Sequence, residues 1–120
     1  MAAPKYTVAF TSDAKQDVAS LDGSIKKRLK KVLEDKLAVN PSGYGTPLRG
    51  DLAGYWKHEF AAHRVIYRIY DDRQLVVVCA VGKRQAEHVS DVYQQLVPMV
   101  KAGRIAGQVL LVLAELKPKR

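Results

Sequence analysis

Three closely spaced segments rich in aromatic and β-branched residues constrain the fold of this 120-residue chain more than any other feature. They run from Tyr55 to Phe60, from Arg64 to Tyr70 and from Leu75 to Val81. The turns between them, Ala61-Ala62-His63 and Asp71-Asp72-Arg73, are too short for a crossover helix. The three segments are therefore predicted to form an antiparallel meander.

The residues before the meander predict a strand and a helix hairpin. Alternating apolar residues from Tyr6 to Phe10 indicate the strand, and Thr11 and Ser12 are suited to cap a first helix. A second helix follows from Ile25 to Leu37, where apolar residues recur every three to four positions. The segment 40–47 is rich in Pro and Gly and predicts one long loop.

The residues after the meander predict two more helices. One runs from about Gln85 toward Pro98, which is expected to end it, and one from about Arg104 to Leu116. The predicted class is α+β, with an N-terminal strand and helix hairpin packed on one face of a small, mostly antiparallel sheet and an extra C-terminal helical segment.

Composition narrows the partners and the chemistry. A net charge of +8 and a pI near 9.7 favour polyanionic partners such as nucleic acid. The single cysteine, Cys79, excludes an internal disulfide, and the histidines lack metal-ligand spacing, so we expect neither a metal nor another cofactor. The N-terminus carries no leader pattern and 109–114 is too short to span a membrane, which favours a cytoplasmic protein. Motifs for acyl transfer and nucleotide hydrolysis are also missing from the sequence.

Strand alternation predicts a basic sheet face. Lys57 and Glu59 share one face of their strand, and Arg64, Ile66 and Arg68 share one face of the next. We expect Lys57, Arg64 and Arg68 to lie on a face that no helix covers, with the opposite residues Val65, Tyr67 and Ile69 facing the helices. Two interpretations remain open: a cleft for polyanions, or arginines that pair with Glu59 and the 71–72 turn on a solvated surface. The lysines of the second helix allow the same two interpretations, nucleic-acid contact or a solvated helix face.

Several short motifs together resemble the RelE/ParE toxin superfamily. They are Pro47-Leu48-Arg49-Gly50, Gly54-Tyr55-Trp56-Lys57, His63-Arg64-Val65-Ile66-Tyr67, Val81-Gly82-Lys83-Arg84 and Val92-Tyr93. The resemblance covers about residues 5–96 and implies the toxin of a type II toxin–antitoxin system with a cognate antitoxin partner. In the RelE branch this is a metal-independent endoribonuclease that cuts mRNA on the ribosome. In the ParE branch it is a non-enzymatic inhibitor of DNA gyrase, and an inactive RelE-like binding module is a third interpretation.

The resemblance also implies roles for particular residues. Lys57, Arg64 and Arg84 match the cations that bind the scissile phosphate, and Tyr93 matches a tyrosine that orients the substrate. Glu59 stands where many relatives have a second basic residue, so it either weakens the cation cluster or supplies a general base. The spacing from Arg84 to Tyr93 is longer than in RelE, which makes His88 an alternative to Tyr93. The candidate RNA-binding residues are Arg49, Arg68, Lys83, Lys26, Lys27 and Lys30.

Residues 97–120 lie beyond the resemblance. Their block of apolar residues, 109–113, needs a surface to pack on. It is expected to pack on the toxin domain, 1–96, or to lie at an interface in a homodimer or a toxin–antitoxin hetero-oligomer.

Overall fold

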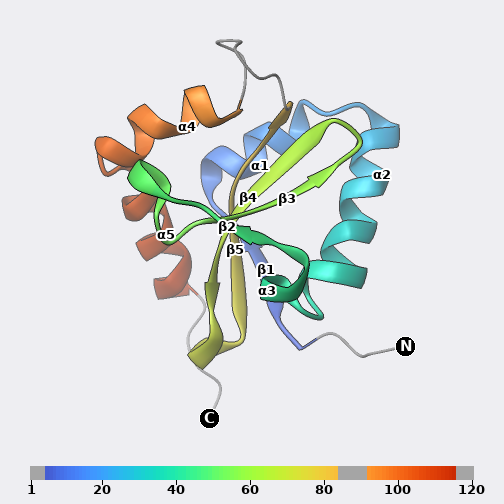
Figure 1. Ribbon diagram of the computed structural model, residues 1–120, viewed down its shortest axis with the longest axis horizontal. Coiled ribbons are helices and arrows are strands. Elements are labelled where there is room, and N and C mark those ends of the chain that lie inside the picture. Colours follow the sequence, from blue (N-terminus) through green and yellow to red (C-terminus); the bar gives the residue numbers. More distant parts are fainter. Residues whose placement is uncertain (1–4, 84–91, 116–120) are drawn as a thin grey trace.

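The computed structural model, which describes residues 5–83 and 92–115, has an α+β fold built on one five-stranded sheet (Figure 1). The strand order is β1-β5-β4-β3-β2. The strands are β1 (Thr7–Phe10), β2 (Thr46–Pro47), β3 (Trp56–Phe60), β4 (His63–Tyr70) and β5 (Leu75–Lys83). The helices are α1 (Ser12–Ala19), α2 (Gly23–Val32, continued by a π-helical segment, Leu33–Leu37), α3 (Pro41–Tyr44), α4 (Val92–Lys101) and α5 (Arg104–Glu115), and 3-10 turns lie at Gly50–Leu52 and Asp71–Arg73. The predicted fold class is confirmed.

The predicted meander is confirmed as β3, β4 and β5. Strands β3 and β4 pair antiparallel with Glu59 opposite Arg64, and β4 pairs antiparallel with β5. Ala61 and Ala62 form the β3–β4 turn with φ values of 45° and 61°, the left-handed conformation that a two-residue hairpin needs. The N-terminal strand β1 pairs with the other edge of β5 in parallel. The remaining strand pairs are antiparallel, so the sheet is mostly antiparallel.

The helix hairpin α1–α2 covers one face of the sheet. Thr11 caps α1 by accepting a hydrogen bond from the backbone N–H of Ala14, and Asp22 caps α2 in the same way. Buried residues of the hairpin and its π-helical extension pack against residues that alternate along β4 and β5: Ala14, Leu29, Val32, Leu33 and Leu37 against Val65, Tyr67, Val76, Val78 and Val81. The predicted inward direction of Val65 and Tyr67 is therefore confirmed.

The opposite face of the sheet is not open, and this part of the prediction is wrong. Helices α4 and α5 lie against it, on the other side of the sheet from α2 in Figure 1. Leu96 of α4 and Ile105, Val109 and Val112 of α5 are buried there among sheet residues that include Ile66, Leu75, Val77 and Cys79. The physical reason is that β5 is apolar on both faces, so water must be excluded from both.

Two further differences concern Pro residues. The segment 40–47 is not one long loop, because Asn40 caps the short helix α3 through Gly43 and Pro41 occupies its first turn, where its missing N–H costs nothing. Pro98 does not end α4, which runs on to Lys101. The predicted start of that helix, near Gln85, lies outside the described residues.

Candidate functional site

Lys57, Glu59 and Arg64 form a compact charged cluster on β3 and β4. Arg64 Nε donates a hydrogen bond to Glu59 Oε2 at 2.9 Å, and Lys57 Nζ lies 3.5 Å from the same oxygen. Alternation along the two strands places all three side chains on the face that carries Ile66. One carboxylate oxygen therefore joins two cations.

The cluster is partly accessible to solvent, and its geometry is held by hydrogen bonding. Lys57 and Glu59 are 28% and 34% exposed at their side chains, whereas Arg64 is only 12% exposed. A mostly covered guanidinium held by a charge-assisted hydrogen bond has little freedom to reorient. The arrangement offers an incoming anion two positively charged groups and, beside them, a carboxylate that can accept a proton.

Arg68 lies on the same face of β4 but belongs to a different environment. Its guanidinium stacks over the ring of Tyr55 at 5.0 Å and over that of Tyr70 at 5.8 Å. Gly54, with φ of +92°, passes close to it. Burial raises the pKa of both tyrosines, so Arg68 faces neutral aromatic rings. Arg68 therefore shares a face with Lys57 and Arg64, as predicted, but the prediction that it is uncovered is wrong, because Tyr55 and Tyr70 pack against its guanidinium.

The other predicted RNA-binding residues lie on separate surfaces. Arg49 is exposed in the loop that leaves the sheet beside Tyr55, where the N–H of Leu48 donates to the Tyr55 carbonyl. Lys83 is exposed at the end of β5, and alternation places it on the face opposite to Gly82, the partner of Arg64. Three exposed lysines, Lys26, Lys27 and Lys30, lie on α2 and so on the other side of the sheet from the cluster.

Three predicted residues are not placed with the cluster. Arg84 and His88 lie outside the described residues. Tyr93 is in the first turn of α4, and its side chain is also outside the described part. The described part of β5 does reach the cluster, because Gly82 is the register partner of Arg64.

An apolar groove of about 460 Å³ lies between β1 and α2. Val8 and Phe10 of the edge strand β1, with Tyr6 just before it, form one wall, and Leu29 and Leu33 form the other. The charged residues along its rim are Lys26, Lys30 and Glu34. This groove was not predicted from the sequence. The sequence feature that could have indicated it is the alternation of three large apolar residues, Tyr6, Val8 and Phe10, near the N-terminus.

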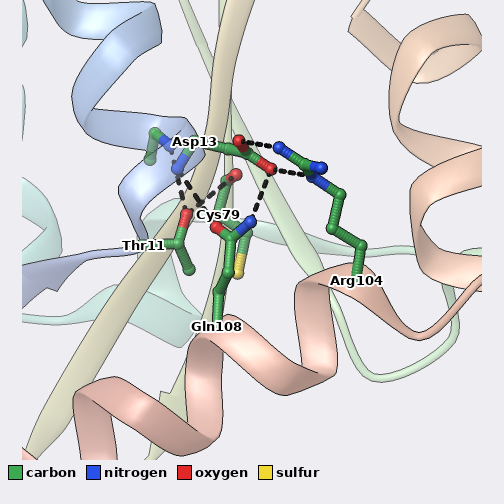
Figure 2. Close-up of polar contacts among 6 residues, drawn as sticks. Thr11, Asp13, Cys79, Arg104 and Gln108 are labelled. Carbon is green, nitrogen blue, oxygen red and sulfur yellow. Dashed lines mark hydrogen bonds and ion pairs between the residues drawn. The ribbon is translucent and has the colours of Figure 1, made fainter.

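A polar network fixes the C-terminal helix to α1. Figure 2 shows the carboxylate of Asp13 between Arg104 and Gln108, with Arg104 Nε at 2.7 Å and Nη2 at 2.8 Å from its two oxygens. The amide of Gln108 donates to Asp13 at 2.7 Å and accepts from the Asp13 backbone N–H at 3.1 Å. The hydrogen bonds from Arg104 hold the pKa of Asp13 below its usual range.

The same network borders a cleft of about 420 Å³ between α1 and α4. Asp17 lies in its wall and accepts a hydrogen bond from the Val81 N–H at 3.1 Å, and partial burial raises the pKa of Asp17. Neither a metal-binding group of His, Cys, Asp and Glu nor a helix that could span a membrane is found in the described ranges, 5–83 and 92–115.

Comparison with known proteins shows what this chain is similar to. Residues 8–87 match the family model described as the ParE toxin of type II toxin–antitoxin systems. The chain is 32% identical over 90 residues to Toxin RelG of Mycobacterium tuberculosis, which covers 75% of this chain and 98% of RelG. It is 39% identical over 80 residues to Toxin YoeB of Streptomyces coelicolor, covering 61% of this chain and 93% of YoeB.

Solved structures agree with the sequence matches. The toxin–antitoxin complex RelBE2 from M. tuberculosis matches with a TM-score of 0.64 and 33% identity, covering 70% of this chain and 95% of the matched one. The intact E. coli RelBE toxin–antitoxin complex matches with a TM-score of 0.55 and 25% identity, covering 67% and 98% of the two chains.

Proposed function

This chain belongs to the RelE/ParE superfamily and is the toxin of a type II toxin–antitoxin system, and from that premise we propose that it is a ribosome-associated mRNA endoribonuclease that inhibits translation. The observation that carries the proposal is the oxygen of Glu59 held between Arg64 and Lys57. A protein that only binds a partner does not require a carboxylate fixed between two cations at a partly exposed position on the sheet.

Cleavage of RNA without a metal ion needs three groups that the proposal assigns. Glu59 takes the proton of the 2′-hydroxyl while its oxygen attacks the adjacent phosphorus. Lys57 and Arg64 neutralise the charge that develops on the phosphoryl oxygens. The bond from phosphorus to the 5′-oxygen then breaks, and the leaving oxygen needs a proton. We assign the donation of this proton to Tyr93 or His88, and the family resemblance adds Arg84 to the cations that bind the phosphate.

A second candidate function follows from the family model, which is that of the ParE toxin. In this interpretation the chain inhibits DNA gyrase without catalysis, and the charged cluster serves only to bind. The two candidates differ in what stops first in a cell, translation or DNA synthesis.

We also propose that a cognate antitoxin occupies the apolar groove between β1 and α2. The M. tuberculosis and E. coli structures that this chain resembles are toxin–antitoxin complexes. Two lysines on the groove rim and an overall charge of +8 suit an acidic, amphipathic segment that folds on contact.

A brief induction experiment tests the proposed activity in cells. Incorporation of labelled amino acids is expected to fall before incorporation of labelled thymidine. Lys57→Ala is expected to relieve growth arrest, because loss of a transition-state contact costs about 10²–10³ in rate. Lys15→Ala is the matched control, since Lys15 is an exposed lysine on α1, across the sheet from the cluster. If thymidine incorporation falls first and Lys57→Ala remains fully toxic, the gyrase interpretation replaces this one.

A further inference from the structure

Strand β5 changes its neighbour partway along its outer edge. Strand β1 pairs with β5 only as far as Val78, since the last register pair joins Phe10 to Val78. The β4–β5 register shifts at the same point, so that Cys79 is an extra, bulged residue between Val78 and Ala80. The backbone groups of β5 beyond this bulge have no strand on their outer side and need other hydrogen-bond partners.

Helix α1 supplies those partners. The hydroxyl of Thr11, the N-cap of the helix, donates to the Cys79 carbonyl at 3.4 Å (Figure 2). Further along α1, Asp17 Oδ2 accepts a hydrogen bond from the Val81 N–H at 3.1 Å. The Asp17 carboxylate therefore takes the place that a backbone carbonyl would have in a longer β1.

The Asp17 carboxylate is partly buried without a cation to balance it. Within residues 5–83 and 92–115 it forms no ion pair, and Arg104, which lines the same cleft, is bound to Asp13 instead. Burial and then the charge of Asp13 raise the pKa of Asp17, whereas the hydrogen bond from the Val81 N–H lowers it. The bond to Val81 is thus what favours the charged form, and a charge-assisted bond of this kind is about twice as strong as a neutral one.

The stretch of β5 that Asp17 holds lies beside the charged cluster. Val81 is followed by Gly82, which is the register partner of Arg64. A glycine gives a strand no side chain to pack and leaves its backbone freer than other residues do. The position of Arg64 relative to Glu59 therefore depends on what holds β5 at Val81, on the side away from β4.

We propose that Asp17 is a positioning residue for the charged cluster: it holds the Val81 N–H, which fixes the end of β5 and through it the guanidinium of Arg64. This role rests on the proposed endoribonuclease function, in which Arg64 neutralises charge on the phosphoryl oxygens. Asp17 acts through the strand, since it lies on α1 and its hydrogen bond is to the backbone of β5.

Nuclear magnetic resonance of the full-length protein tests the contact directly. Asp17→Ala is expected to reduce the hydrogen-exchange protection of the Val81 amide by about tenfold and to shift the Nε–H signal of Arg64. Asp17→Asn is expected to keep both signals near those of the wild type, because its amide oxygen can accept the same bond. Val32→Ala is the matched control, since it removes buried apolar groups from α2 but no hydrogen bond, and it leaves both signals unchanged.

Cleavage of mRNA on purified ribosomes, with the toxin in excess, separates positioning from binding. Asp17→Ala is expected to lower the cleavage rate at saturating toxin by about tenfold, because a displaced phosphate contact slows the chemical step. The toxin concentration that gives half of the maximal rate should stay unchanged. Asp17→Asn and Val32→Ala should cut at nearly the wild-type rate, at a temperature where circular dichroism shows every variant to be folded.

The Arg64 signal distinguishes failure of this role from failure of the proposed function. If the wild type cuts no mRNA, the proposed function is wrong, and the Arg64 signal still decides the positioning role: a shift in Asp17→Ala supports it, and an unchanged signal overturns it. If the wild type does cut, an undiminished rate in Asp17→Ala overturns the role. Equal losses in Asp17→Ala and Val32→Ala also overturn it, because the rate would then follow stability alone.

Discussion

Replacing Ile105 by alanine is expected to destabilise the whole domain, because this side chain connects α5 to the sheet. Ile105 is fully buried in the cluster that contains Ile66, Val77 and Leu96. The change removes three buried carbon groups at about 0.8 kcal/mol each and leaves a cavity, so the free energy of unfolding should fall by about 3 kcal/mol. That is a large fraction of the 5–15 kcal/mol of a typical domain.

Leu110→Ala on the same helix is the matched control. Leu110 is 66% exposed, so the expected loss is below about 1 kcal/mol, and alanine is the better helix former. Urea unfolding followed by the fluorescence of Trp56, the only tryptophan, measures both variants. Trp56 packs on the opposite face of the sheet and therefore reports global unfolding. Low protein concentration keeps self-association out of the result. Equal losses in the two variants would refute the packing of α5 on the sheet.

Three further outcomes can be measured on the same protein. The thiol of Cys79 is fully buried and its pKa is raised to about 12, so iodoacetamide at pH 8 should modify it only after unfolding in urea; labelling of the native protein contradicts this. Gly45→Ala places a methyl group where the Tyr67 hydroxyl lies and should lower the free energy of unfolding by about 2–4 kcal/mol, which a urea titration with an unchanged midpoint would disprove. Arg104→Gln should reduce stability at pH 7. Because Arg104 lowers the pKa of Asp13 in the folded state, the difference from wild type should be fully present above pH 3.8 and fade as the pH falls further, and a difference that grows in acid contradicts the ion pair.

Much of the fold could be predicted from local patterns. The alternation and β-branched content of 55–81 predicted the meander, and the apolar stripe from Ile25 predicted α2. These predictions succeeded because strands and amphipathic helices each bury a periodic set of residues. The predicted bounds of the last helix, 104–116, also agree closely with those of α5, Arg104–Glu115.

The covered second face could not be predicted from strand alternation alone. Alternation states which residues share a face, but not which helix covers it. The continuous apolar run from Leu75 to Val81 was the available indication that β5 is buried on both faces. Strand alternation also fails locally, because the β4–β5 register shifts between Ile66 and Tyr67. As a result the consecutive residues Cys79 and Ala80 both belong to the apolar cluster under α4 and α5.

The candidate site could be predicted only in part. Strand register brings Lys57, Glu59 and Arg64 together, as their spacing in the sequence allows. The position of Arg68 depends on two aromatic neighbours, and Tyr55 comes from the end of a loop, so residue spacing carries no information about that contact. The roles of Arg84, His88 and Tyr93 stay predictions from the resemblance.

Cleavage of mRNA on purified ribosomes by the wild-type protein and by Glu59→Gln tests the central claim most directly. The glutamine has nearly the same shape but cannot accept the 2′-hydroxyl proton, so the cleavage rate should fall by about 10²–10⁴ while the protein still binds the ribosome. Cleavage by wild type that Glu59→Gln leaves unchanged would contradict the proposed role of the cluster. A wild type that binds programmed ribosomes without cutting the message would contradict the proposed activity itself.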